Sequence, residues 1–590
     1  MCGIIGFNWK DKALIKKATT LIRYRGPDDS GEYIDKNVSL GHARLSIIDL
    51  SRKAKQPMNT SNYSIIFNGE IYNYKEIKKE LKEYKFETNS DTEVIIYAYD
   101  KWKEKCLDKF NGMFALCIYD KKNKELFLAR DRFGIKPLYY SNKKGKFVFG
   151  SELKSILGFL DKKKIDPVGL SQFFSFRFTL GETTLVKGIN KFLPGHFMTY
   201  DLSSKKIKRY NRYYDIKKQK TTKKSFSQAK KELRALMKKS VERRMVADVP
   251  VACLLSGGID SSIITTLAKK YNKNLNTFSI GFDTTNELPF AKIVAKQFNT
   301  NHHEFRIDKN SVLDYLDDMV YHMDEPIGDP GFLPIYVLSK NVSKHNKVVL
   351  SGDGGDEVFC GYDRYKMFHY GLSLRHLAIY DFNNDILKRL KKMRNKNDYS
   401  SFFEVIRLFD DSELKKLGIK GFNARMFWND KYKSALSNAQ EFDINTLLPN
   451  DFFMKADKMS SAFGLEQRVP YLDHELVEFA FSLPLKYKLK LWNEKFILKD
   501  AFKTMLPKKI SNRKKHGFDV PIDYWFKNVL ADKLKELLRT NNHKLYKQKY
   551  VLNLLEKIKK TGRNYKMNFI LAQKLWSILM FEMWYERFMR

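Results

Sequence analysis

The pattern of apolar residues changes once along the chain, and this change constrains the fold more than any other feature of the sequence. Before about residue 200, short apolar runs at 64–67, 113–119, 126–129 and 147–149 are separated by Gly, Asn, Asp and Lys, which is typical of strands and turns. After residue 226, apolar runs alternate with helical patterns, which predicts βαβ units and a parallel sheet. The chain has 590 residues, and single cores stop growing near ~250–300 residues, so we expect at least two domains.

A polar, Lys-rich segment separates the two patterns. We therefore predict an α+β domain at 1–205, a linker at 206–225 and an α/β domain at 226–590. Helices interrupt the first domain at 74–84 and 93–102. The second is predicted to run as helix 226–244, strand 249–255, helix 263–271, strand 276–282, helix 291–298 and strand 347–350, with helices dominating beyond about residue 380. The last apolar stretch, 568–589, predicts a packed amphipathic helix.

Composition argues against a membrane protein and against a disulfide framework. No uncharged apolar run approaches the ~18 residues that a membrane helix needs, and the first residues lack the basic and apolar regions of a signal peptide. The five cysteines, at 2, 106, 117, 253 and 360, are odd in number and form no CxxC pair. We therefore expect no zinc ribbon, no membrane partner and a reducing cytoplasm as the location.

The formal net charge of +40 raises the question of a nucleic-acid partner. Lysine is spread over the whole chain rather than gathered in one stripe, and Asn, Ile, Tyr and Phe are plentiful too. Such a spread is typical of a compositional bias. We expect no nucleic-acid partner.

Cys2 follows the initiator methionine and precedes Gly3. Removal of Met1 would place the thiol of Cys2 beside its own α-amine. That amine has a pKa near ~8, so it can act as the base that a nucleophilic thiol needs. Cys2 is therefore a candidate catalytic nucleophile.

Five segments surround this candidate with further motifs, at 2–7, 25–28, 44–49, 68–73 and 90–93. Together they closely resemble the class II glutamine amidotransferase domain, over about the first 200 residues. The resemblance implies an N-terminal-nucleophile fold, an αββα sandwich in which two stacked sheets lie between helices. It also implies that glutamine is hydrolysed at Cys2 to release ammonia.

The resemblance assigns roles residue by residue. Asn68 and Gly69 match the oxyanion hole, a pair of donors aimed at developing negative charge. Arg44 matches the residue that binds the glutamine α-carboxylate, for which a guanidinium is well suited. Glu70 and Asp91 match the residues that hold the α-amino group. The remaining residues of the implied glutamine site are Leu45, Ser46, Ile47 and Ile48.

A Gly-rich loop at 254–262 lies between a predicted strand and a predicted helix. Gly257 and Gly258 let backbone N–H groups approach an anion, and the helix offers its N-terminus to phosphate. Asp260 can bind the magnesium that accompanies ATP. Hydroxyl donors are added by Ser256, Ser261 and Ser262. The loop lacks the G-K-[ST] ending of a Walker A motif.

The loop resembles the signature of ATP pyrophosphatases, and the segment at 348–357 resembles the second nucleotide element of asparagine synthetases. This resemblance implies that Asp356 binds Mg2+ and that Lys458 neutralises pyrophosphate. The segments at 466–473 and 514–518 complete the family pattern. The resemblance places adenosine contacts at Leu255, Ile280, Ser351 and Gly352.

The implied reaction is adenylation of an acceptor carboxylate by ATP–Mg2+, followed by attack of ammonia that reaches it through an internal tunnel. Well-known asparagine synthetases carry Glu where this chain has Asp353, the predicted general base. The segment 324–334 also lacks an evident Arg for the α-carboxylate of aspartate. Aspartate is the expected acceptor, and a uronic-acid sugar is the first alternative.

Two further alternatives are weaker. A tRNA-modifying ATP pyrophosphatase would share the Gly-rich loop but would not need Cys2 or the motif at 68–73. A non-catalytic scaffold is disfavoured because the motif residues are intact. The sequence does not reveal the oligomeric state, for which a homodimer is one candidate.

Overall fold

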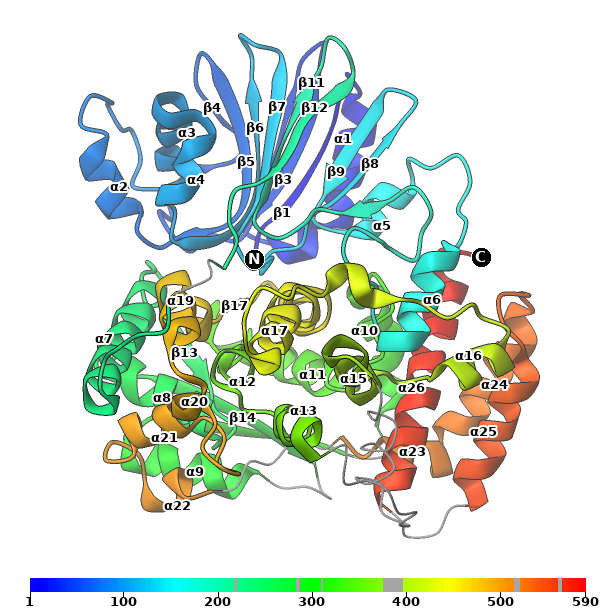
Figure 1. Ribbon diagram of the computed structural model, residues 1–590. Coiled ribbons are helices and arrows are strands. Elements are labelled where there is room, and N and C mark those ends of the chain that lie inside the picture. The colour runs from blue at the N-terminus through cyan, green and yellow to red at the C-terminus, as the bar shows by residue number, and fades with distance from the viewer. Residues whose placement is uncertain (217–219, 283–286, 309–310, 375–395, 514–519, 561–564) are drawn as a thin grey trace.

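The computed structural model describes residues 1–590 except 217–219, 283–286, 309–310, 375–395, 514–519 and 561–564. Its first part contains two stacked antiparallel sheets (Figure 1). The first sheet has the order β10 (Asn190–Lys191), β8 (Tyr139–Lys143), β9 (Lys146–Gly150), β1 (Gly3–Phe7), β3 (Ser39–Arg44), β2 (Asp29–Ile34). The second has the order β12 (Lys206–Arg212), β11 (His196–Asp201), β7 (Glu125–Arg130), β6 (Gly112–Asp120), β5 (Tyr63–Ile71), β4 (Met58–Asn59).

Apolar side chains from both sheets form the core between them, among them Ile4, Leu40, Ile66, Leu128 and Phe147. Helices α1 (Lys12–Leu21) and α5 (Leu153–Leu157) contact the first sheet, and α3 (Asp91–Trp102) contacts the second. Helices α2 (Tyr74–Glu80) and α4 (Cys106–Lys109) lie beside α3 (Figure 1). This arrangement confirms the predicted αββα sandwich.

The predicted linker is wrong over its first part. Residues Lys206–Arg212 form β12, which pairs antiparallel with β11 at the edge of the second sheet. The strand is mostly exposed and carries four basic residues, Lys206, Lys208, Arg209 and Arg212, which suits an edge that must not pair with other chains. The sequence of this polar segment resembles that of a linker, because its own residues do not indicate that it pairs with β11.

A parallel sheet organises the second part of the chain, as predicted. Its order is β15 (Asn301–Ile307), β14 (Asn276–Phe282), β13 (Val251–Leu254), β16 (Val348–Leu350), β17 (Glu466–Arg468). Successive side chains of β13 pack on opposite faces of the sheet: Ala252 lies in the core on one face, and Val251 and Cys253 lie in the core on the other. Both faces are therefore covered, as is usual for a parallel sheet. The sequence did not reveal β15 or β17.

Helices cover this sheet and extend beyond it. On one face lie α7 (Phe226–Arg244), α8 (Ile259–Ala268) and α9 (Leu288–Gln297). The other face packs against α10 (Leu313–Met323), α11 (Phe332–Val342) and α18 (Phe453–Ser461). The further helices are α12 (Gly355–Phe359), α13 (Asp363–Leu374), α15 (Asp398–Ile406), α16 (Asp411–Leu417), α17 (Ala435–Phe442), α19 (His474–Ser482), α20 (Leu485–Lys488), α21 (Phe496–Phe502), α22 (Lys508–Ser511), α23 (Ile522–Asn528), α24 (Leu530–Asn541), α25 (Gln548–Lys560) and α26 (Tyr565–Phe588).

The final helix, α26, was predicted to be amphipathic, but residues 575–584 are all buried, including the polar Ser577 and Glu582. One of its partners is α6 (Pro167–Phe176), whose Phe173 ring lies 6.0 Å from that of Phe581. Residues of the predicted first domain thus pack against the end of the chain (Figure 1). Among the helices that the structure describes, none has the length and apolarity to cross a membrane.

Two candidate active sites

Cys2 lies directly before β1, where the two halves of the molecule meet (Figure 1). Its carbonyl oxygen accepts a hydrogen bond from Nε of Arg25 at 2.9 Å, and its Sγ donates to the carbonyl of Leu45 at 3.8 Å. Burial raises the pKa of the thiol, and the nearby N-terminal amine opposes this rise. Burial also lowers the pKa of the Met1 amine to about 5. A base beside the thiol is therefore needed before it can react.

Asn68 and Gly69 lie near the end of β5, a strand that contacts β1. The φ angle of Gly69 is +152°, and a Cβ there would lie 2.0 Å from the carbonyl oxygen of Met113. Only glycine fits this position. The side chain of Asn68 is fully buried, and neither of its amide atoms has a hydrogen-bond partner among the described residues. An amide donor of this kind suits an oxyanion hole.

The predicted glutamine-binding charges lie on neighbouring elements. The Arg44 guanidinium donates to the backbone carbonyls of Asp49 and Ser51, at 2.5 and 3.0 Å. Asp91 accepts a hydrogen bond from the Ile71 amide at 2.9 Å, and burial raises its pKa to about 6. Glu70 is buried and lies 3.4 Å from Nη2 of Arg468, with its pKa raised mainly by burial.

The loop that follows Arg44 joins the two halves. Its apolar residues are buried, and its backbone contacts come from both sides: the Ser46 amide donates to Asp28 at 2.7 Å, and the Ile47 carbonyl accepts from the Asp248 amide at 2.9 Å. The predicted loop residues Leu45, Ile47 and Ile48 are each less than a tenth exposed. The loop at the predicted glutamine site is thus held partly by the second half of the chain.

A cavity of about 490 Å³ lies at the carboxyl ends of β13, β14 and β16. Ligands of parallel sheets usually bind at this edge. Most of the predicted ATP-binding residues line it, namely Leu255, Ser256, Gly258, Asp260, Ser261, Ile280, Ser351 and Gly352. Asp353 and Asp356 line it as well. The predicted residues Gly257 and Ser262 do not; instead they shape the loop.

The conformation of the Gly-rich loop explains these two positions. Gly257 has a φ of +71°, and a Cβ there would lie 2.5 Å from the backbone of α9. The Ser262 hydroxyl donates to the Gly258 carbonyl at 2.6 Å, which fixes the first turn of α8. The loop therefore presents the N-terminus of α8 toward the cavity, as an anion-binding site requires.

Lys495 is a site residue that the sequence did not reveal. Its Nζ lies 2.5 Å from Oδ2 of Asp260 and 2.6 Å from Oδ1 of Asp356. It lines the cavity, and the two acids raise its pKa against the effect of burial. No local signal distinguishes this lysine among the 108 basic residues, because its partners are more than a hundred positions away in sequence.

The structure does not support Lys458 in the predicted pyrophosphate role. Its Nζ is buried and lies 2.7 Å from Glu152 and 3.0 Å from Asp324, and it does not line the cavity. Lys458 and these two acids form part of a buried cluster of charges between the two halves of the chain. The cation that faces the cavity beside both predicted magnesium ligands is Lys495.

Asp353 is held at the cavity wall by two donors. The Ser351 hydroxyl donates to its Oδ2 at 2.8 Å, and Nε2 of Gln467 donates to the same oxygen at 2.6 Å. Burial raises the pKa of Asp353, whereas nearby Lys455 lowers it. An ionisable carboxylate with a raised pKa inside a cavity can serve as a general base.

The short strand β17 connects the two sites. Gln467 points toward Asp353, while its neighbours point toward the predicted glutamine site. Nη2 of Arg468 lies 3.4 Å from Glu70, and Nε of Arg468 lies 2.8 Å from Glu466. Alternation along a strand places adjacent side chains on opposite faces. The three residues of β17 together therefore contact both candidate sites: Gln467 contacts one, and Arg468 and Glu466 lie at the other.

Two family models match the chain. The glutamine amidotransferase domain matches residues 1–214, and the asparagine synthase model matches residues 232–586. The chain belongs to the asparagine synthase family. Among its relatives in this family, glutamine-hydrolysing asparagine synthetase 1 of Bacillus subtilis is 35% identical over 99% of this chain and 96% of the relative. Glutamine-hydrolysing asparagine synthetase 3 of the same organism is 32% identical over 94% and 93%.

Relatives of this asparagine synthase family member do not all bear the same name. Amidase chry2 of Gibberella zeae is 27% identical over 92% of each chain. The family motif at 514–518 lies outside the described residues.

Proposed function

We propose that the protein is a glutamine-dependent asparagine synthetase. Glutamine is hydrolysed at Cys2, and ammonia is transferred to adenylated aspartate, giving asparagine, glutamate, AMP and pyrophosphate. The observation that carries this proposal is the assembly of the two motif sets into two separate buried sites that share β17. The family and its glutamine-hydrolysing relatives support the same reading.

In the first half-reaction, the Cys2 thiolate attacks the glutamine amide carbon. Asn68 and the Gly69 N–H stabilise the oxyanion, and ammonia leaves with formation of a glutamyl thioester on Cys2. Arg44 holds the α-carboxylate of glutamine, and Glu70 with Asp91 holds its α-amino group. Water then hydrolyses the thioester and releases glutamate.

In the second half-reaction, the acceptor carboxylate attacks the α-phosphate of ATP and pyrophosphate leaves. The N-terminus of α8 and Lys495 neutralise phosphate charge, and Asp353 takes a proton from the attacking ammonia. The ammonia reaches the adenylate inside the protein, since in bulk water at neutral pH it would be mostly protonated. AMP is the leaving group of this last step.

Asp260 and Asp356 fit a magnesium ion that arrives with ATP. Mg2+ commonly uses one or two carboxylates together with substrate phosphates rather than a cage made only of protein ligands. Both carboxylates line the cavity in which ATP is proposed to bind. Bound there, the ion would offset the charge of the phosphates.

The uronic-acid alternative remains the second candidate, because Asp353 is one methylene shorter than the Glu of well-known synthetases. The experiment that separates the two supplies ATP, magnesium and either ammonium or glutamine. Acceptor-dependent pyrophosphate release is then compared for aspartate and for uronic acids. Release with uronic acids alone would overturn the proposal.

The matched variant for this experiment is Cys2→Ala. It should lose glutamine-dependent release and keep ammonia-dependent release, because the two reactions use different sites. Loss of both in a folded protein would contradict the division of labour. We also propose a cytoplasmic location, supported by five free cysteines, and a homodimer as the assembly to be tested by light scattering.

A further inference from the structure

Among the charged residues that line the large cavity, four lie near one another and belong to no nucleotide motif. They are Arg177 at the end of α6, Asp329 before α11, Asp451 before α18, and Lys455 within α18. Lys455 lies close enough to Asp353 to lower its pKa, so this group adjoins the proposed base. The four residues thus mark the end of the cavity where the acceptor would meet ammonia.

Arg177 is presented by the first half of the chain. Its backbone is left-handed, its N–H donates to the Phe173 carbonyl at 2.7 Å, and its carbonyl accepts from the Gly328 amide at 2.8 Å. These bonds fix the residue directly beside Asp329. Its guanidinium makes no hydrogen bond or ion pair with any residue that the structure describes, although its charge lowers the pKa values of Asp329 and Asp451.

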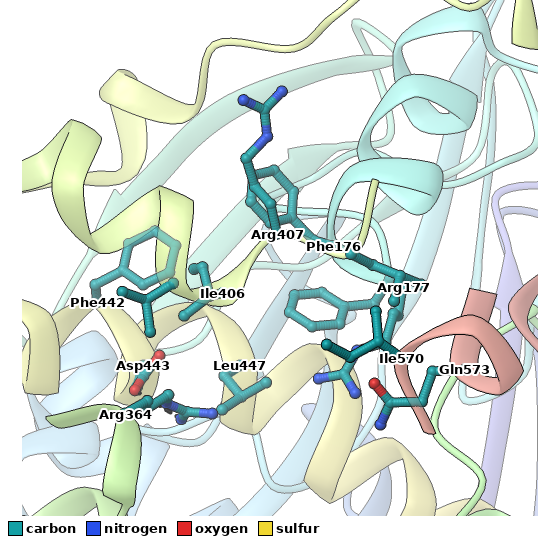
Figure 2. A pocket seen from close by; sticks show the side chains of 13 residues that line it. Phe176, Arg177, Arg364, Ile406, Arg407, Phe442, Asp443, Leu447, Ile570 and Gln573 are labelled. Atoms are coloured by element: carbon teal, nitrogen blue, oxygen red, sulfur yellow. Dashed lines mark hydrogen bonds and ion pairs between the residues drawn. The ribbon is translucent and has the colours of Figure 1, made fainter. Parts of the chain in front are cut away.

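The same side chain also lines a smaller cavity of about 170 Å³ (Figure 2). There the other two arginines have partners: Arg364 lies 2.8 Å from Asp443, and Arg407 is paired with Asp411. In Figure 2 the guanidinium of Arg407 points away from the other labelled charged groups. Arg177 therefore differs from its neighbours in being available to a ligand.

The acids at this end are not equivalent. Asp329 accepts from the Gly331 amide at 2.9 Å and lies 2.6 Å from Nζ of Lys455, and the two cations Lys455 and Arg177 lower its pKa despite burial. Asp451 is 1% exposed, and its Oδ1 has no hydrogen-bond partner among the described residues. Burial and the charge of Asp329 raise its pKa to about 7.

Asp451 belongs to a π-helical stretch, Asp443–Phe452, that leads into α18. Such backbone is rare and occurs frequently at functional sites. A buried carboxyl group without a donor is costly unless a ligand supplies one. A cationic ligand group beside Asp451 would supply that donor, whereas Asp329 is already paired with Lys455.

We propose that Arg177 and Asp451 select the acceptor, with Arg177 binding an α-carboxylate and Asp451, aided by Asp329, binding an α-ammonium group. The proposal rests on the proposed function, and it deepens it by naming the groups that distinguish an α-amino acid from other carboxylates. A uronic acid has no cation to offer Asp451. The acceptor site is also incomplete without the first half of the chain, which supplies Arg177.

The test uses the full-length protein with ammonium as nitrogen donor and measures acceptor-dependent pyrophosphate release. Succinate is aspartate without its amino group, and β-alanine is aspartate without its α-carboxylate. Asp451→Asn should raise the KM for aspartate roughly 10–100-fold and narrow the preference for aspartate over succinate. Arg177→Met should raise the same KM by a similar factor and narrow the preference over β-alanine.

Arg407→Met is the matched control, because its guanidinium is already paired and lies outside the large cavity. The KM for ATP and the glutaminase activity should stay unchanged in all three variants. An unchanged KM for aspartate in Asp451→Asn or in Arg177→Met would overturn the inference. An equal loss of pyrophosphate release with aspartate, succinate and β-alanine would overturn it too.

If Asp451→Asn does not fold, Arg177→Met decides alone, because the Arg177 side chain makes no hydrogen bond or ion pair, among the described residues, that the substitution would remove. If wild-type protein uses uronic acids but not aspartate, the proposed function itself fails. That result is visible before any variant is made, so the two failures are distinguishable.

Discussion

Met1 is 1% exposed, and its buried amine has a pKa of about 5. While Met1 is present, the free amine belongs to the residue before the nucleophile rather than to Cys2. We expect its removal in active protein, because the small Cys2 side chain permits cleavage and the freed amine can then accept the thiol proton. Intact-mass measurement should show the loss of one methionine. Full glutaminase activity in protein that retains Met1 would exclude the free-amine mechanism.

Asp353 offers the second prediction at the scale of single residues. If it is the base for ammonia, Asp353→Asn should still bind ATP and form the acyl-adenylate, while product formation falls by roughly 10²–10⁴-fold. If it only shapes the nucleotide site, binding of ATP should weaken instead. Nucleotide binding by calorimetry and product formation by single turnover separate these roles. Near-normal product formation by the folded variant would end the catalytic interpretation.

At the scale of elements, β17 contacts both candidate sites. Gln467 donates to Asp353 at 2.6 Å, and a hydrogen bond to a carboxylate favours its ionised form and lowers its pKa. Gln467→Leu removes this bond, so the pKa of Asp353 should rise further. The acidic limb of the ammonia-dependent rate should therefore move to higher pH, by about one to two units.

The rates for this test are expressed per concentration of un-ionised ammonia, so that titration of the substrate does not mask the shift. Glutaminase activity serves as the internal control, because Gln467 points away from Glu70. A pH profile identical to that of the wild type would show that Gln467 does not tune the base.

At the scale of the whole molecule, buried charges join the two halves. Arg25 lies 2.5 Å from Glu152 and 2.7 Å from Asp457, and Lys458 lies 2.7 Å from Glu152. Breaking one partner of a buried cluster leaves an uncompensated charge. Lys458→Met should therefore destabilise the protein by about 3–5 kcal/mol and lower its melting temperature.

The exposed pair Lys347–Asp28 also joins the two halves, at 2.7 Å, and provides the control. Lys347→Met should cost about 0–1 kcal/mol, because solvent screens the pair. Differential scanning calorimetry and ATP binding are measured on both variants. Weaker ATP binding by Lys458→Met at unchanged stability would restore the pyrophosphate role that the motif suggested.

The sequence alone determined the local parts of this protein. The Gly-rich loop at 256–258, the start of a helix directly after it, and the helix Phe226–Arg244 could be predicted, because neighbouring residues set their backbone conformation. The two classes of sheet followed from the spacing of apolar residues. Family resemblance then supplied roles that no spacing could give.

Only the tertiary structure decided which distant residues meet. Lys495 forms ion pairs with Asp260 and Asp356. Arg177, from the first half of the chain, lines the cavity in the second half. Lys458 lies outside that cavity and is paired with Glu152 in a buried cluster. The strands Lys206–Arg212 and Glu466–Arg468 likewise exist through their partners. The physical reason is that charge pairing and strand pairing depend on distances in space, which a linear pattern of residue types does not contain.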